Sequence, residues 1–309
     1  MAQSSLRFWL KVSRAQVLPV MVLPVMIGAA GAFAFSQSFH LGLFLITLIG
    51  ALSAHLFSNM INDLWDFKNG VDQAAEESAA SISTNSRVLP NGQVNIRTFA
   101  LVTWGYFALA LIAGISLSVI VGWTVLLFAV VGGLIAYFYV APPLKFGYRG
   151  KGYSELAIFL AFGVLPVTGT YYVLTESLHI EAFLISIPIG LLTTLILYNH
   201  HFLHWEADLN AGKKTLVVIF GEKKALNFSK FLAGLSYLSL LLLVIGQVLP
   251  WYALIALLSA YPLFKTYGTL SSKNESKQYA VLMGASLKAT IRTGLIMTIA
   301  LIISGIITI

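Results

Sequence analysis

The sequence contains no cysteine and few charged residues. The absence of cysteine excludes disulfides, thiolate metal sites and cysteine nucleophiles. Charged residues make up only 10% of the 309 residues, whereas 58% are hydrophobic and the mean hydropathy is +0.85. A chain of this composition is too apolar for a soluble domain. The composition therefore predicts an all-α, polytopic integral membrane protein.

Long apolar runs divide the chain into spans. A helix needs about 20 apolar residues to cross the hydrocarbon of a bilayer. By that criterion residues 1–309 form a single membrane domain with nine spans, and the break between the seventh and eighth rests only on residues 247–250. The predicted spans are 17–35, 41–60, 99–120, 121–140, 156–174, 182–198, 231–248, 251–267 and 290–309.

Positive charge is distributed unevenly over the connections between these spans. All 19 lysines and arginines fall on one side, and the connections on the other side carry none. Because positive residues remain cytoplasmic, we expect the N-terminus in the cytoplasm and the C-terminus on the opposite side of the cell's inner (plasma) membrane. The formal charge of +7 thus reflects topology and contact with anionic lipid rather than nucleic-acid binding. We expect no cleavable signal before the first span, since a full-length apolar span follows Arg7, Lys11 and Arg14 without a small-residue cleavage pattern.

An acidic segment, residues 62–72, directly follows the second span. Ionised carboxylates near the membrane are costly unless they are paired or bind a metal, so this segment is a candidate functional site. On a continuing helix Asn62, Asp63 and Asp66 share one face, and the turn favoured by residues 69–70 returns Asp72 to them. These oxygen ligands suit Mg²⁺, which retains waters and is usually completed by substrate phosphates.

A second acidic group, Glu206 and Asp208, follows another apolar span on the same predicted side. Two such clusters would repel one another unless divalent cations and a bound diphosphate neutralised them. The basic residues Arg87, Lys145, Arg149, Lys213 and Lys214 lie in the connections that hold the two clusters, or beside them. The two connections, at about 62–97 and 199–230, are therefore predicted to form a cytoplasmic site.

Four motifs occur in order along the chain: residues 62–66 with Asp72, residues 87–92, residues 139–145 with 148–150, and residues 206–208 with 212–216. Together they resemble the UbiA superfamily of intramembrane prenyltransferases, from about the second span to the seventh. Within the superfamily the first motif is most similar to that of enzymes that prenylate 1,4-dihydroxy-2-naphthoate in menaquinone biosynthesis. The resemblance implies nine helices around a central cavity, Mg²⁺, a polyprenyl diphosphate donor and an aromatic acceptor.

The resemblance also implies roles for individual residues. His204 departs from the pattern, since relatives usually carry an aspartate there. The expected catalytic residues are Asp63, Asp66 and Asp208; the expected metal ligands are Asn62, Asp63, Asp66, Asp72, Glu206 and Asp208; the expected diphosphate-binding residues are Arg87, Tyr139, Lys145, Arg149 and Lys213; and the residues expected near the acceptor or a second site are Asn59, Asn199 and His204.

Other interpretations stay open at this stage. The histidines His200, His201 and His204 could bind zinc, lie near the diphosphate or acceptor, or pack at the interface. The acceptor could be a hydroxybenzoate, a homogentisate, a porphyrin or a sugar phosphate. Coupling of ions to a transporter or flippase is a further alternative, although carriers favour ionisable groups near the bilayer midplane. Aromatic side chains could stabilise an allylic cation or merely pack; the candidates are Trp65, Phe67, Phe162, Tyr171 and Tyr172.

Overall fold

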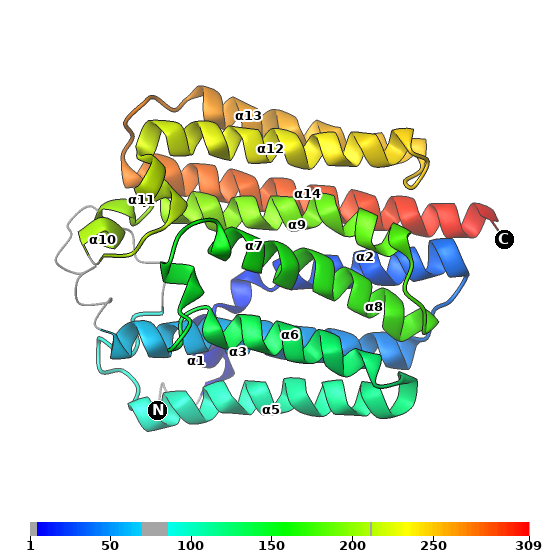
Figure 1. Cartoon of the computed structure of the whole chain (residues 1–309), viewed down its shortest axis with the longest axis horizontal. Coiled ribbons are helices and arrows are strands. Elements are labelled where there is room, and N and C mark those ends of the chain that lie inside the picture. The colour runs from blue at the N-terminus through cyan, green and yellow to red at the C-terminus, as the bar shows by residue number, and fades with distance from the viewer. Residues whose placement is uncertain (1–4, 70–85, 211, 309) are drawn as a thin grey trace.

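The computed structural model describes residues 5–69, 86–210 and 212–308, and every regular element in those ranges is a helix. Figure 1 shows the long helices side by side, with the short helices α10 and α11 gathered at one end of the bundle. The elements are α1 (Leu6–Val12), η2 (Ala15–Val17), α2 (Pro19–Ser36), α3 (Leu41–Lys68), α5 (Ile96–Val121), α6 (Thr124–Phe138), η3 (Phe146–Tyr148), α7 (Tyr153–Phe159), η4 (Leu160–Val164), α8 (Leu165–Thr175), α9 (Ile180–His201), α10 (Trp205–Asn210), α11 (Leu216–Phe220), α12 (Glu222–Ile245), η5 (Trp251–Ser259), α13 (Ala260–Gly268) and α14 (Ser276–Thr308).

The all-α membrane architecture is confirmed, but the count of nine spans is not. Seven helices in the described ranges are long and apolar enough to cross a membrane. The expected fourth span is the shorter helix α6, and the expected eighth is divided between η5 and α13. Pro250, immediately before η5, cannot donate a backbone hydrogen bond, which explains why α12 does not continue into it.

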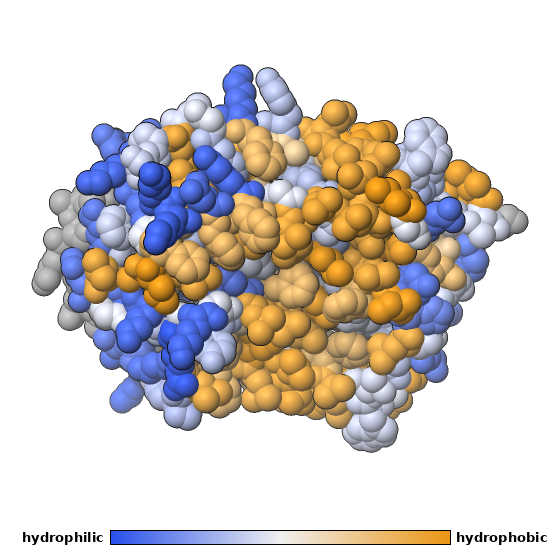
Figure 2. Space-filling model, turned by 45° about the horizontal axis from the view of Figure 1, so that its top comes forward, coloured by the Kyte–Doolittle hydropathy of each residue, from blue (hydrophilic) through white to orange (hydrophobic). Residues whose placement is uncertain are grey.

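Two helices begin well before the apolar runs that they contain. The helices α12 and α14 begin at Glu222 and Ser276, well before the expected spans at residues 231 and 290. Lysine and glutamate are good helix formers, so charge ends the apolar span without ending the helix. Figure 2 agrees with this arrangement, since apolar side chains cover the middle of the molecule and hydrophilic ones gather toward its ends.

Contacts between helices are close where side chains are small. Helix α2 packs against α14, α8 and α9, and α3 packs against α5. The segment from α7 to α8 runs on through a π turn, η4, just before Pro166, whose missing N–H a wider turn accommodates. There a Cβ on Gly163 would lie 2.5 Å from the Cα of Gly190 on α9, so the two backbones touch. By contrast, α6 buries Val125 alone among its own residues.

Candidate active site

The first acidic cluster lies on the last turns of α3, as the sequence predicts. Asp63 is buried, and its two carboxylate oxygens have different partners: Arg14 Nη2 lies 3.2 Å from Oδ1, and the backbone N–H of Ser86 donates to Oδ2 at 3.0 Å. Arg14 also donates to the carbonyl oxygen of Asn59 at 2.8 Å. The side-chain oxygen of Asn62 is buried without a hydrogen-bond partner among the described residues. Asp72 lies outside the described residues.

The second acidic cluster lies on α10. Asp208 is buried, and Lys213 Nζ lies 3.7 Å from its Oδ1. The backbone N–H of Lys213 also donates to the carbonyl oxygen of Asp208 at 2.8 Å, so backbone and side chain both hold Lys213 beside Asp208. Glu206 is exposed and does not line the cavity described below. The structure therefore separates the two acidic residues of the second motif.

Tyr148 connects the two clusters. Its hydroxyl donates a hydrogen bond to Asp66 Oδ1. Lys213 Nζ lies over its ring, 4.6 Å from the centroid, while the same lysine pairs with Asp208. Asp66 and Asp208, which come from distant parts of the chain, are thus joined through one tyrosine and one lysine.

Burial shifts the pKa values of three residues at the polar end of the site: Asp208, Tyr148 and His204. Burial raises the pKa of the Asp208 carboxyl; Lys213 lowers that pKa and the charge of Asp66 raises it. Burial and the charge of Asp66 also raise the pKa of the Tyr148 hydroxyl, which stays protonated and able to donate. Burial, with the charges of Lys213 and Arg87, lowers the pKa of His204 to about 4, so its imidazole is neutral at pH 7.

A cavity of about 1170 Å³ extends from these carboxylates into the helix bundle. Its polar end includes Asn62, Asp63, Asp66 and Asp208, and its apolar wall comes mainly from α3, α5, α6 and α8. Small residues of α5 and α6 leave room in that wall. The predicted site residues that line the cavity are Asn59, Asn62, Asp63, Asp66, Tyr139, His204, Asp208 and Lys213.

Besides Glu206, four predicted residues lie outside the cavity lining: Arg87, Lys145, Arg149 and Asn199. Lys145 donates to Asn69 Oδ1 at 2.9 Å, and Arg149 donates to the carbonyl oxygen of Pro143 at 3.0 Å. Asn199 belongs to a buried network behind the cavity, where it donates to Ser286 and accepts from Ser229. Arg87 does not line the cavity either, although its charge acts on His204.

The histidines gather at the polar end. His200, His201 and His204 all line the cavity, and the rings of His200 and His204 are 5.3 Å apart. In the described ranges no three His, Cys, Asp or Glu side chains are arranged to hold a metal ion on their own.

The hard oxygen donors nevertheless suit Mg²⁺ held jointly with a diphosphate. The unpartnered oxygen of Asn62 and the carboxylates of Asp66 and Asp208 all line one cavity. Mg²⁺ usually takes only one or two protein carboxylates and completes its shell with waters and substrate phosphates. Asp63, whose oxygens are already engaged, would need a change of partners to join them.

Two functional residues were missed by sequence reasoning. Arg14 was interpreted only as a topological charge, and Tyr148 belonged to a motif without an assigned role. A buried carboxylate needs a partner, so the need for a cation to pair with Asp63 is the signal that could have found Arg14.

Among the aromatic candidates, Phe162 lines the cavity and contacts the ring of His55 at 4.8 Å between centroids. The others lie outside the lining: Trp65, Phe67, Tyr171 and Tyr172.

Tyr148 gives a first testable prediction. Tyr148→Phe removes the hydrogen bond to Asp66 and keeps the ring under Lys213, whereas Tyr148→Leu removes both. A hydrogen bond to a charged group contributes about 1.5–3 kcal/mol, so we expect the first variant to lose roughly tenfold or more in catalytic efficiency. The second should lose more. Steady-state kinetics measures both, and two fully active variants would contradict the bridge.

The chain is similar in sequence to known proteins over most of its length. The sequence model of the UbiA prenyltransferase family matches residues 21–306. The chain is 30% identical over 264 residues to a 2-carboxy-1,4-naphthoquinone phytyltransferase of Synechocystis, covering 84% of this chain and 80% of that protein. It is 26% identical to a 1,4-dihydroxy-2-naphthoate octaprenyltransferase of Bacillus subtilis, covering 95% and 92%.

Solved structures show the same fold. A UbiA homolog from Archaeoglobus fulgidus bound to GPP and Mg²⁺ superposes with a TM-score of 0.63 at 18% identity, covering 96% of this chain and 99% of that one. A digeranylgeranylglyceryl phosphate synthase gives a TM-score of 0.66 at 17% identity, covering 96% and 98%. At these identities the likeness concerns the architecture of the helix bundle.

Proposed function

Since the chain belongs to the UbiA prenyltransferase family and is a membrane-embedded prenyltransferase, we propose that it transfers a polyprenyl group from a polyprenyl diphosphate to 1,4-dihydroxy-2-naphthoate in menaquinone biosynthesis. The observation that carries the proposal is that Asp66 and Asp208 line one cavity and are joined through Tyr148 and Lys213. The names of the relatives support a naphthoate acceptor.

The donor headgroup is assigned to the polar end of the cavity. Asn62, Asp66 and Asp208 would hold Mg²⁺ there, with Asp63 and Asp72 as further candidate ligands. When bound, Mg²⁺ neutralises the diphosphate as it leaves. Lys213 is placed to add positive charge to the same oxygens, and Tyr139 lines this end of the cavity. Arg87, Lys145 and Arg149 do not line the cavity and suit capture of the anion before it enters.

The reaction then proceeds inside the apolar part of the cavity. The bond between the first carbon of the tail and the diphosphate oxygen breaks, and the oxygen keeps the electron pair. The acceptor ring forms a new carbon–carbon bond at the position that carries its carboxyl group, which leaves as CO₂ and returns its electrons to the ring. The ring of Phe162 lines the cavity and is proposed to stabilise the intermediate cation, and the apolar walls exclude water.

Membrane location follows from the donor, since each CH₂ of a polyprenyl tail favours lipid by about 0.8 kcal/mol. We propose that the polar end faces the cytoplasm, with the N-terminus on that side and the C-terminus on the other. The distribution of lysine and arginine supports this orientation. In Figure 1 the two ends of the chain lie at opposite ends of the bundle.

The decisive experiment combines purified protein, Mg²⁺ and a polyprenyl diphosphate with a panel of aromatic acceptors, and mass spectrometry identifies the products. We expect a prenylated, decarboxylated naphthoquinol. If product formed only with a hydroxybenzoate, a homogentisate, a porphyrin or a sugar phosphate, that compound would be the acceptor in place of the naphthoate. Lipid or ion transport into proteoliposomes without any prenylated product would favour a carrier.

Metal removal provides a second test. Incubation with EDTA is expected to abolish product formation, because uncompensated carboxylates would then face the diphosphate. Added Mg²⁺ should restore the rate, and added Ca²⁺ should restore much less, because Ca²⁺ prefers more ligands at longer distances. Turnover that persists in excess EDTA would argue against the metal.

A further inference from the structure

A buried glutamate lies behind the polar end of the cavity, and the reaction proposed above leaves it without a role. Glu155 is 8% exposed and does not line the cavity. An ionisable side chain is costly to bury in a membrane helix, so Glu155 is a functional candidate. It lies in the first turn of the segment Tyr153–Thr175, where the free N–H groups of the helix favour a negative charge. The helix end therefore offsets part of the cost of burying the carboxylate.

Two neighbours fix the orientation of this carboxylate. Ser154 Oγ donates to Glu155 Oε2 at 2.7 Å. The other oxygen, Oε1, lies 3.9 Å from Nδ1 of His201, at the end of α9, which packs against α7. Both of these facing atoms are buried, and neither has a hydrogen-bond partner among the described residues. Each unpaired group is costly when buried, so their facing arrangement indicates that they act together.

His201 connects Glu155 to the cavity. Its ring lines the cavity, whereas its Nδ1 is buried on the side of Glu155. A carboxylate that faces Nδ1 holds the proton of the neutral ring on that nitrogen, which leaves the lone pair of Nε2 for the cavity. The distance of 3.9 Å is longer than a hydrogen bond. Catalytic contacts are often long without substrate and shorten when it binds.

The chemistry of a hydroxylated aromatic acceptor requires a group of this kind. The ring carbon that attacks the allylic cation is made electron-rich by the hydroxyl oxygen on the neighbouring carbon. As the carbon–carbon bond forms, that oxygen becomes a carbonyl oxygen and its proton leaves. When CO₂ departs, the electrons of the broken bond return to the ring, and the same oxygen takes a proton back. One base that accepts the proton and then returns it serves both steps.

We propose that Nε2 of His201 accepts the proton of the acceptor hydroxyl as the carbon–carbon bond forms and returns it when CO₂ leaves, with Glu155 as the positioning residue for His201. The proposal rests on the proposed function and adds the acceptor side of the site to it. Ser154 holds Glu155 in place, and the charge of Glu155 stabilises the imidazolium that forms. The acceptor hydroxyl is thereby assigned to the wall of the cavity formed by the end of α9.

The test measures kcat and KM for variants in lipid nanodiscs with Mg²⁺, geranylgeranyl diphosphate and the naphthoate acceptor. His201→Gln removes the base and should lower kcat about a hundredfold or more, since general acid–base catalysis contributes about 10²–10⁴-fold. Glu155→Gln should lower kcat about tenfold or more, because the new amide can donate to Nδ1 and place the ring proton on Nε2. KM for the donor should not change, because neither residue is assigned to the diphosphate.

A double variant separates a working pair from two independent structural roles. His201→Gln combined with Glu155→Gln should lose no more activity than His201→Gln alone, because Glu155 acts only through His201. Losses that multiply in the double variant would overturn the pairing.

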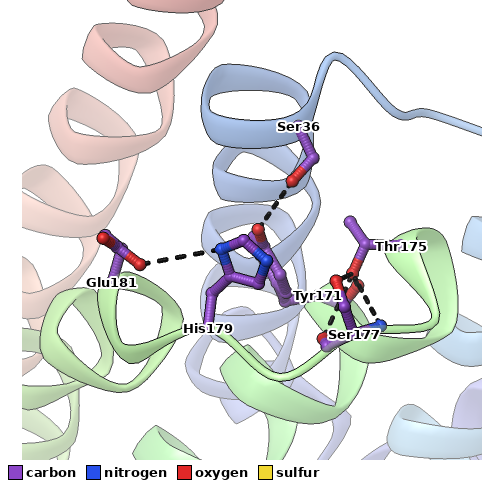
Figure 3. A network of polar contacts seen from close by, with 6 residues as sticks. All are labelled: Ser36, Tyr171, Thr175, Ser177, His179 and Glu181. Carbon is purple, nitrogen blue, oxygen red and sulfur yellow. Dashed lines mark hydrogen bonds and ion pairs between the residues drawn. The ribbon is translucent and has the colours of Figure 1, made fainter.

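A second histidine–glutamate pair, at the other end of α9, provides the matched control. Figure 3 shows His179 and Glu181 there, beside the hydrogen bond between Ser36 and Tyr171. The two side chains are 3.8 Å apart, as the buried pair nearly is, but they are exposed and do not line the cavity. His179→Gln and Glu181→Gln should therefore keep full activity.

An acceptor analogue provides a measurement that does not depend on the folding of a variant. The methyl ether of the hydroxyl beside the carboxyl group has no proton to give. The unmodified protein should show a kcat/KM about tenfold or more lower for this ether than for the naphthoate, and the difference should be smaller in His201→Gln. Equal values for the two acceptors in the unmodified protein would overturn the proposal, as would full activity of His201→Gln. Absence of product from the unmodified protein with every acceptor would instead overturn the proposed function.

Discussion

Replacement of Asp66 by asparagine is expected to lower kcat/KM by about a thousandfold, which corresponds to roughly 4 kcal/mol of transition-state stabilisation. Asp208→Asn should have an effect of similar size. Both changes keep the shape of the side chain and remove the charge that would hold the metal beside the leaving diphosphate. Product formation in the presence of Mg²⁺, measured by mass spectrometry at several donor concentrations, separates a loss of kcat from a rise in KM.

Two further acidic residues serve as comparisons. Glu275→Gln, on the exposed connection between α13 and α14, is the matched control and should keep full activity. Glu206→Gln should cost less than tenfold, because Glu206 is exposed and does not line the cavity. A thousandfold loss in Glu206→Gln would place that residue among the metal ligands, and full activity in Asp66→Asn would refute the assignment of the site.

The second large effect concerns stability. Arg14→Gln leaves the buried carboxylate of Asp63 without its cation, and breaking a buried ion pair from one side typically costs about 3–5 kcal/mol. We expect a clear fall in the melting temperature of the detergent-solubilised protein. The loss of the hydrogen bond from Arg14 to the backbone of Asn59 adds to the effect.

A double variant distinguishes the ion pair from simple packing. Arg14→Gln combined with Asp63→Asn removes both charges, so it should recover much of the melting temperature lost by the single variant. Activity should remain low, because Asp63 lies in the proposed ligand set. A double variant that is less stable than Arg14→Gln alone would show that the charge of Asp63 does not cause the instability.

The sequence predicted the positions of Asp66 and Asp208 through local rules. Residues three and four apart share a helix face, and both acidic clusters follow apolar spans. These rules apply within one helix, so they could not show that Tyr148 and Lys213 join the clusters, nor that Glu206 turns away from Asp208. The positive-inside pattern also gave Arg14 a sufficient explanation as a surface charge, which concealed its contact with Asp63.

The pattern of apolar residues could not show which way Asn199 faces or where the eighth span is divided. Asn199 sits at the end of α9 beside His200, and it was expected near the acceptor or a second site. On a helix the next positions point in different directions, and Asn199 instead faces Ser229 and Ser286 on α12 and α14. Hydropathy alone likewise predicted spans without revealing that the eighth divides into η5 and α13.

The backbone contact between Gly163 and Gly190 limits which helices can move apart to let a lipid into the cavity. No side chain separates η4 from α9 there, so the two segments are already in backbone contact, and this part of the bundle is expected to stay rigid during turnover. Helix α6, which buries Val125 alone, is held by far fewer interior contacts. Admission of a donor from the bilayer should therefore occur by outward swinging of α6, a motion that spin labels on α6 and α9 could record as a change in their separation.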